Sequence, residues 1–248
     1  MDTRRSLAHA TYELLDTSMV VDVPPEAKEW AEMTGADLPW AEDHFLERVG
    51  GEPLNPPPSH VNWPHAKAGN AAHISSGTFS HTYPERYWSK FANVGETRPN
   101  GRQVFVPHNG IRYEFGDLGD LVNLLERSPL TRQAYLPVWF PEDTGAVSHQ
   151  RVPCTLGYHF MIRDSQLSCR YYLRSCDLVR HWHNDLYLTG RLMQWVCDQL
   201  NERWDAADPD MAPSTSLLVP GELHVFITSL HAFMGDTRKL EDMASWLR

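Results

Sequence analysis

No stretch of this sequence reaches the roughly 18 consecutive apolar residues that a transmembrane helix needs. The first residues, MDTRRSLAHATYELL, also lack an apolar run ahead of a small-residue cleavage site, so no signal peptide is expected. These two absences predict a cytoplasmic protein that has no membrane partner.

Basic residues are outnumbered: 22 Lys and Arg against 32 Asp and Glu give a formal net charge of −10. A general nucleic-acid binder needs a basic face for its phosphate contacts, so nucleic acid is not an expected partner. A small anionic substrate is compatible with this charge, because a local arginine cluster holds one phosphate whatever the net charge.

Cysteine is scarce, and the four cysteines form no CxxC pair. They are Cys154, Cys169, Cys176 and Cys197. Closely spaced cysteine pairs are the usual sign of a zinc site, so the sequence predicts no metal. Disulfides are not expected in a cytosolic chain, and the remaining question is whether one cysteine is a nucleophile.

The length of 248 residues and the hydrophobic spacing predict a single α+β domain over residues 1–248. Apolar residues at helical spacing predict helices over residues 5–16, 40–49, 117–127 and 185–203. Strand-like runs cover residues 133–140, 155–163, 167–173 and 223–230. This order favours a mixed β-sheet packed with helices.

A polar, proline-rich stretch over residues 52–80 interrupts the pattern. Its three consecutive prolines cannot lie inside a helix or a central strand. Because long irregular loops in compact domains are usually functional or disordered, we expect this excursion to form a wall of the active site.

The most informative stretch is 151–177, in which Cys154 follows a proline at the start of a predicted strand. Arg174 and Ser175 come twenty residues later, and Asp177 follows them. The permanent charge of an arginine favours an ionised thiol nearby. An arginine beside a serine hydroxyl also suits a phosphate. One strand end is therefore expected to supply both a nucleophile's environment and an anchor for the substrate.

The run PC…F…LSC..Y.RS.D, with this spacing, resembles the catalytic segment of the thymidylate synthase family. RSPLTRQAYLPVWFPED is similar to the family's segment before the nucleophile, and LHVFITSLH to its sugar-binding segment. The resemblance covers residues 117–235. It implies a thymidylate-synthase-like sheet with one face forming a dimer interface, and 5,10-methylenetetrahydrofolate as co-substrate.

The resemblance assigns roles to the residues of this motif. Cys154 would be the nucleophile that adds to C6 of a pyrimidine nucleotide. Arg174 and Ser175 would bind the 5′-phosphate, with Arg132 reaching across the interface of a homodimer. Asp177 would contact the pterin ring of the folate.

Further positions follow from the same resemblance. His224 would bind the 3′-hydroxyl of the sugar, and Phe226 replaces the family's companion tyrosine, which weakens or rearranges that contact. Tyr83 is a further candidate for contact with the nucleotide. Trp63 and Arg151 are the candidates on the folate side.

A carboxylate with a water chain is needed to move protons. Glu42, within WAEDHFLERVGG, best matches the spacing of the family's catalytic glutamate to a downstream tryptophan, here Trp63. Glu47 is the alternative, because the alignment needs an insertion in this region.

The residue that reads the pyrimidine edge sets the substrate. The family has an asparagine thirty-one residues after the nucleophile, and that count reaches Asp185 here. An amide complements uracil, whereas a protonated carboxyl, or a carboxylate facing N3-protonated cytosine, complements cytosine. Deoxycytidylate hydroxymethylases of this family carry an aspartate there. A slip of one residue would place Asn184 at the base and restore uracil.

Two features favour a hydroxymethyl over a methyl product, because both admit water. Arg151 stands where synthases have an apolar residue, and the final ASWLR does not resemble the apolar tail that closes their site. The leading hypothesis is a phage deoxycytidylate hydroxymethylase that converts dCMP to 5-hydroxymethyl-dCMP. The alternatives are a dCMP methylase, a dUMP hydroxymethylase or thymidylate synthase, a CMP hydroxymethylase, and an inactive nucleotide-binding member of the family.

Overall fold

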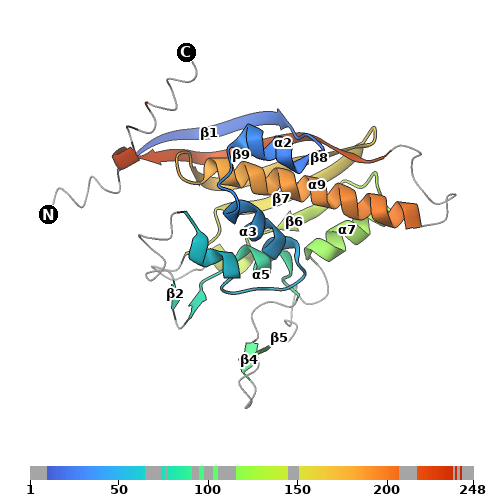
Figure 1. Ribbon diagram of the computed structural model, residues 1–248, viewed down its shortest axis with the longest axis horizontal. Coiled ribbons are helices and arrows are strands. Elements are labelled where there is room, and N and C mark those ends of the chain that lie inside the picture. The colour runs from blue at the N-terminus through green and yellow to red at the C-terminus, as the bar shows by residue number, and fades with distance from the viewer. Residues whose placement is uncertain are drawn as a thin grey trace.

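A five-stranded sheet of order β1-β9-β8-β7-β6 lies at the centre of the computed structural model (Figure 1). The structure describes residues 10–64, 74–75, 77–90, 95–97, 103–105, 116–144, 151–206, 217–236, 238 and 241. The strands are β1 Thr11–Asp22, β6 Tyr135–Pro137, β7 Thr155–Arg163, β8 Gln166–Asp177 and β9 Val219–Phe233. Strands β8 and β9 are parallel and the other neighbours are antiparallel, so the predicted mixed sheet and α+β class are confirmed.

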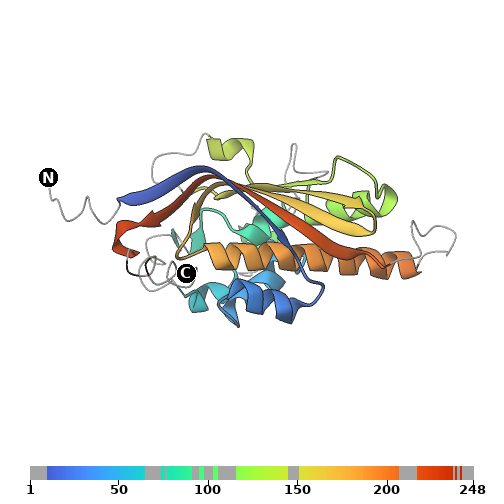
Figure 2. The ribbon, with the colours of Figure 1, turned by 90° about the horizontal axis from the view of Figure 1, so that it is seen from above.

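The long helix α9 covers one face of the sheet, and α2 and α3 lie on the same side (Figure 2). The helices are α2 Ala27–Thr34, α3 Trp40–Val49, α5 Tyr83–Tyr87, α7 Leu118–Arg127, α8 Pro141–Thr144 and α9 Trp182–Ala206. Short 3-10 helices span Pro58–Asn62 (η1) and Met234–Asp236 (η4), and two small hairpins pair β2 Ile74–Ser75 with β3 Thr78–Phe79 and β4 Gly95–Thr97 with β5 Gln103–Phe105. Among the described residues, no helix is both long and apolar enough to cross a bilayer.

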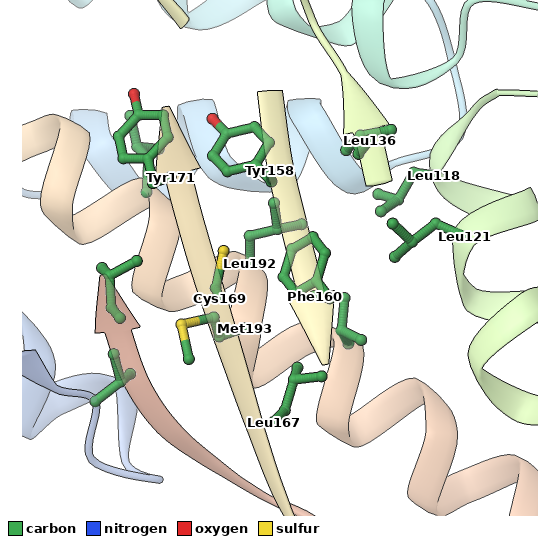
Figure 3. Close-up of a cluster of buried hydrophobic side chains, with 14 of the residues drawn as sticks. Leu118, Leu121, Leu136, Tyr158, Phe160, Leu167, Cys169, Tyr171, Leu192 and Met193 are labelled. Atoms are coloured by element: carbon green, nitrogen blue, oxygen red, sulfur yellow. The ribbon is translucent and has the colours of Figure 1, made fainter. Parts of the chain in front are cut away.

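Alternate residues of β7 and β8 build the core between the sheet and α9. Tyr158 and Phe160 of β7 lie beside Tyr171 of β8, and Leu192 of α9 packs in the same cluster (Figure 3). These side chains are at most 1% exposed, which fits the two-residue period of strands. Complete burial of one such apolar side chain contributes about 1.5–3 kcal/mol. The cluster therefore fixes the strands that carry the site described below.

Trp30 joins α2 to α9 through a very close contact. Its Nε1 donates a 3.1 Å hydrogen bond to the carbonyl oxygen of Tyr187. A methyl group on Gly190 would lie 2.1 Å from that nitrogen, so the helices approach this closely only because residue 190 has no side chain. This contact sets the distance at which α2, and the turn after it, lie against the start of α9.

The helix predicted over residues 5–16 is wrong. Residues 5–9 lie outside the described residues, and residues 11–22 form β1, an edge strand that pairs with β9 along its length. Leu14 and Leu15, expected on one side of that helix, are 64% and 65% exposed on the strand. The reason is tertiary: ladder hydrogen bonds to a strand two hundred residues away outweigh a local helical pattern.

The other expected elements are present; α3 and β7 have the expected bounds, and the ends of the others are shifted. The helix expected at 117–127 is α7, whose N-cap Asp117 accepts a 2.9 Å hydrogen bond from the backbone N–H of Asp120. The strand expected at 133–140 is shorter, and Pro137 ends it on the edge strand β6. Within the 52–80 excursion lie η1, β2 and β3, while residues 65–73 and 76, like the C-terminal residues 242–248, fall outside the described residues.

Candidate active site

Cys154 lies directly before β7, where the β7–β8 hairpin brings it beside Arg174 and Ser175. Its sulfur is 3.6 Å from Ser175 Oγ and 3.8 Å from Arg174 Nη2. The guanidinium is held in place because it donates to the carbonyl oxygens of Pro153 at 2.8 Å and Val152 at 3.1 Å. A hydroxyl donor and a fixed positive charge therefore face a free, partly exposed thiol, which is the environment in which reactive cysteines are found.

The other three cysteines have a different environment. Cys169, Cys176 and Cys197 are buried, and burial raises the pKa of each thiol above its usual value. Desolvation disfavours a thiolate at these positions. Of the four cysteines, Cys154 is thus the one placed to react.

Cys154 opens into a cavity of about 240 Å³ that also reaches α3, η1 and the start of α9. Among the predicted site residues, those that line it are Trp63, Tyr83, Arg151, Cys154, Ser175, Asp177, Asn184 and Asp185. These residues come from the 52–80 excursion, α5, the β7–β8 hairpin with the residues directly before it, and α9. The structure therefore brings together most of the residues that were proposed from the motif and its spacing.

Asp185 and Asn184 both line the cavity, but their hydrogen bonds differ. The Asn184 side chain is 3% exposed and is committed to Asp37, accepting from its backbone N–H at 3.0 Å and donating to its carboxylate at 2.8 Å. Among the described residues, the Asp185 carboxylate accepts only a weak bond, from the Cys176 thiol at 3.6 Å. Asp185 is thus the residue whose polar group remains available to a ligand.

Burial raises the pKa of Asp185 to about 6, although the nearby charge of Arg48 lowers it. Arg48 is 5% exposed, and its guanidinium lies flat on the Tyr83 ring, 3.8 Å from the centroid. Its Nε has no hydrogen-bond partner among the described residues. Tyr83 is anchored through its hydroxyl, which lies 2.8 Å from Thr155 Oγ1. A buried donor and a carboxyl with a raised pKa therefore share this end of the cavity.

The candidate glutamates of α3 are both engaged elsewhere, and neither lines the cavity. Glu42 pairs with Arg191 at 2.9 and 3.0 Å and accepts from the Tyr187 hydroxyl at 2.7 Å. Glu47 accepts 2.5 Å hydrogen bonds from the backbone and hydroxyl of Ser59. The structure does not bring Glu42 to the site, and it places Glu47 one layer behind the wall.

The cavity-facing stripe of α3 consists instead of Trp40, His44 and Arg48. The four-residue spacing puts these three side chains on one side of the helix. Sequence reasoning missed His44 and Arg48, although this i, i+4, i+8 pattern of an aromatic and two basic residues was visible. The wall therefore presents an imidazole and a guanidinium where a carboxylate was expected.

The three residues expected on the folate side, Trp63, Asp177 and Arg151, line the cavity. The Trp63 ring stacks on His181 with centroids 5.6 Å apart and planes 14° apart. Asp177, 5% exposed, accepts from the backbone N–H groups of Val179 at 3.0 Å and Arg180 at 3.1 Å. Arg151 is exposed, and its carbonyl oxygen accepts a 2.9 Å bond from the Ser80 hydroxyl.

His224, Phe226 and Arg132 are not brought into this cavity. Leu223, Val225 and Ile227 face the core, so the alternating His224 and Phe226 point to the opposite face of the sheet. There His224 Nε2 lies 2.9 Å from Glu222, and Phe226 stacks on Tyr172 at 5.4 Å. Arg132 is exposed beside the edge strand β6, outside the cavity.

A second His-x-Phe run, from His231 to Phe233, follows the first along β9. His231 is in register with Asp177, and Ser229 with Ser175, on the parallel neighbour strand. Paired residues of adjacent strands point to the same face. The second run therefore lies at the end of the sheet that carries Ser175 and Asp177. The first run lies farther from that end.

Among the described residues, no group of three or more His, Cys, Asp or Glu side chains is placed to hold a metal ion. The polar groups that converge here are a thiol, a guanidinium, hydroxyls and a carboxyl. Such a set suits covalent chemistry on an anionic organic substrate.

Residues 73–203, more than half of the 248-residue chain, match the family described as thymidylate synthase. The chain belongs to the thymidylate synthase family. Over 118 residues it is 25% identical to a thymidylate synthase of Rhodopseudomonas palustris (strain BisA53), covering 47% of this chain and 36% of that protein. Over 61 residues it is 33% identical to one from Listeria monocytogenes serotype 4a (strain HCC23), covering 25% of this chain and 19% of that protein. The aligned part thus spans 36% of the first relative's length and 19% of the second's.

Proposed function

We propose that this protein transfers a one-carbon unit from methylenetetrahydrofolate to C5 of a pyrimidine nucleotide, and that it converts dCMP to 5-hydroxymethyl-dCMP. The observation that carries the proposal is the thiol of Cys154, 3.6–3.8 Å from Ser175 and Arg174, in one cavity with the available carboxyl of Asp185. Overall, dCMP, methylenetetrahydrofolate and water give 5-hydroxymethyl-dCMP and tetrahydrofolate.

Cys154 acts as the nucleophile. C5 of a pyrimidine attacks an electrophile poorly until a thiolate adds at C6 and gives C5 enamine character. Arg174 lies beside the sulfur, and Arg174 with Ser175 holds the phosphate of the nucleotide. Nε and Nη2 of Arg174 are anchored to backbone carbonyl oxygens. Nη1 makes no hydrogen bond with the described residues, so it is the donor left for an anion.

Asp185 reads the base. Cytosine presents the N3 acceptor and the 4-amino donor, and a carboxyl with a pKa of about 6 supplies a donor and an acceptor when protonated. Asn184, the amide that would suit uracil, is occupied by Asp37. An unsatisfied buried group costs about 1–3 kcal/mol, which is enough to set a preference between the bases.

The residues along the folate side fit a planar ring beside the nucleotide. Trp63 stacked on His181 offers a flat apolar surface, and the Asp177 carboxylate stands near it for the ring's N–H groups. The bound folate supplies the one-carbon unit. Arg151, polar and exposed at the rim, keeps this part of the cavity wet and so favours water addition and a hydroxymethyl product.

The sugar contact is assigned to His231 in place of His224. His231 shares its sheet face with Asp177, whereas His224 lies on the outer face. Phe233 still lacks the hydroxyl of a tyrosine, so this contact remains weaker than in the family's pattern.

The outer face of the sheet would pair with a second copy. Exposed apolar side chains lie on it or along its edge strands, namely Tyr12, Leu14, Leu15, Val20, Tyr135 and Phe226. Exposed apolar side chains gathered on one face favour an interface, and a two-fold dimer buries the same face on both subunits. Arg132 stands beside this face and would reach the phosphate of the other copy.

A second candidate substrate, dUMP, is favoured by one observation. The buried Nε of Arg48 lacks a partner, and a carbonyl oxygen such as O4 of uracil would accept from it. In that case the guanidinium, rather than the Asp185 carboxyl, would set the preference.

Tritium release from C5 of dCMP or dUMP, in the presence of methylenetetrahydrofolate, tests these assignments. We expect release from dCMP, and product mass separates hydroxymethyl from methyl. Cys154→Ser should abolish release while nucleotide binding changes less than about threefold, because a serine hydroxyl is a far weaker nucleophile. Release from neither nucleotide would support the inactive nucleotide-binding member and refute the proposal.

The dimer is tested by mixing two inactive variants. Each site would use Cys154 of one subunit and Arg132 of the other. On mixing Cys154→Ser with Arg132→Ala, about half of the dimers contain one copy of each variant, and each of these has one intact site out of two. About a quarter of the wild-type activity should therefore return. No recovery on mixing, with each variant folded, would refute the contribution of Arg132 across the interface.

A further inference from the structure

His44 is the basic group on the α3 wall whose hydrogen bonds define its proton position. His44 Nδ1 lies 3.3 Å from Glu47 Oε2 and 3.2 Å from Ser59 Oγ. A carboxylate only accepts hydrogen bonds, so the Ser59 hydroxyl donates to Glu47 at 2.5 Å and Nδ1 carries the proton of the ring. The neutral imidazole therefore keeps its lone pair on Nε2, which makes no hydrogen bond with the described residues.

The ring is also fixed in orientation. Trp40 stacks on it with centroids 5.3 Å apart and planes 16° apart, and Glu47 is itself held by the backbone N–H of Ser59. The His44 side chain is 12% exposed, and it lines the cavity that Cys154 opens into. This arrangement of carboxylate, imidazole and cavity is how proteins orient a histidine for proton transfer.

We infer that His44, positioned by Glu47, exchanges protons with the bound pyrimidine in this protein, in the place where a glutamate was expected. This inference rests on the proposed function, because it supplies the proton acceptor for that reaction. Neither Glu42 nor Glu47 reaches the cavity, and His44 is the α3 side chain that presents an acceptor there.

The proton step balances as follows. The thiolate adduct carries the new carbon on C5; the C5–H bond breaks, and its electron pair becomes the double bond from C5 to that carbon. The bond joining that carbon to its carrier nitrogen breaks, with the pair going to nitrogen. Nε2 of His44 takes the proton, directly or through one water, and later passes it to the carrier nitrogen that received the electron pair.

The charge state of His44 suits this task. Burial, with Arg48 nearby, lowers the pKa of His44 to about 4, while Glu47 opposes the shift. The groups that face it are Glu47 on its own helix, Arg48 one turn on, and Ser59 from η1. At neutral pH the ring is uncharged and able to accept, and its basicity is close to that of a carboxylate.

Kinetics of His44 variants test the inference. We expect His44→Gln to lower kcat for tritium release by about 10²–10⁴-fold, the usual contribution of general acid–base catalysis, with KM for the nucleotide within about threefold. His44→Ala should lose a similar factor and regain rate as imidazole is added, which a structural role would not allow. Asp43→Asn, an exposed carboxylate on the same helix, is the matched control and should match wild type.

Glu47→Gln gives a readout that does not need turnover. Its amide can donate to Nδ1, so the ring should switch to the Nε2–H tautomer, visible in ¹⁵N NMR, and kcat should fall. If the wild-type protein is active, two results overturn the inference but leave the proposed function standing. One is a kcat of His44→Gln within about twofold of the wild-type value, and the other is a loss in His44→Ala that imidazole does not rescue. An inactive wild-type protein overturns the proposed function and, with it, the inference. An Nε2–H tautomer of His44 in the wild-type protein overturns the inference whatever the activity.

Discussion

Asp185→Asn should stabilise the protein at neutral pH, because burial makes the ionised carboxylate of Asp185 unfavourable in the folded state. Burial raises the pKa of Asp185 from 3.8 to about 6. Between those values the folded protein binds more protons than the unfolded chain, so the free energy of unfolding falls as pH rises through this window and the full loss is present above pH 6. A shift of about two pKa units corresponds to a loss of at most about 3 kcal/mol in the free energy of unfolding. Because water in the open cavity screens the charge, we expect a loss of about 1–3 kcal/mol.

The amide removes the charge and keeps an oxygen that accepts from the Cys176 thiol, so little else should change at this position. Urea unfolding followed by tryptophan fluorescence measures the difference, and the chain has nine tryptophans. We expect a gain of about 1–3 kcal/mol at pH 7.5 and a clearly smaller gain at pH 4.5. Asp43→Asn, an exposed residue, controls for the general loss of one negative charge.

Two results would refute this reasoning. One is a gain of equal size at both pH values, which would mean that the carboxyl does not titrate in this window. The other is a loss of stability at pH 7.5, which would mean that the carboxylate is satisfied by groups other than a ligand. The same variant should also shift tritium release from dCMP towards dUMP, and an unchanged preference would remove Asp185 as the residue that reads the base.

Two further predictions concern the framework that holds the site. Asp143→Asn breaks the buried ion pair with Arg86, whose two hydrogen bonds are 2.8 and 2.9 Å long. It should lower the free energy of unfolding in urea by about 3–5 kcal/mol. A loss below about 1 kcal/mol would show that the pair is solvated. Gly190→Ala places a methyl group 2.1 Å from Trp30 Nε1 and should lower the free energy of unfolding by about 1–3 kcal/mol or more. Gly119→Ala, where the nearest atom is 3.4 Å away, is the control and should be close to neutral.

Local patterns predicted well those features that depend on neighbouring residues. The α7 helix was recognised because its cap, Asp117, and its buried stripe are all contained in eleven residues. The approach of Cys154 to Arg174 was also predictable, because both belong to one hairpin with a two-residue turn, and its register fixes which residues face each other. In both cases the sequence separation is short and the geometry follows from the element itself.

Features that depend on distant packing were missed or misplaced. The choice between the two His-x-Phe runs depends on which one lies in register with Asp177, and that pairing is parallel and long-range. The face of α3 that lines the cavity depends on how α9 and η1 pack around it, so spacing alone directed attention to Glu42 and Glu47 rather than to His44. A helical pattern at residues 11–16 was overridden for the same reason, by pairing with β9.

The parallel pairing of β8 with β9 has a consequence for when a binding surface exists during folding. The hairpin alone delivers the sulfur and the guanidinium, yet the cavity also needs α3, η1 and the start of α9, the helix that connects β8 to its parallel neighbour β9. Long-range parallel pairing forms late, because its loop-closure entropy must be met first. A nucleotide therefore finds no partly built pocket to occupy, and its binding energy acts on the complete native state alone.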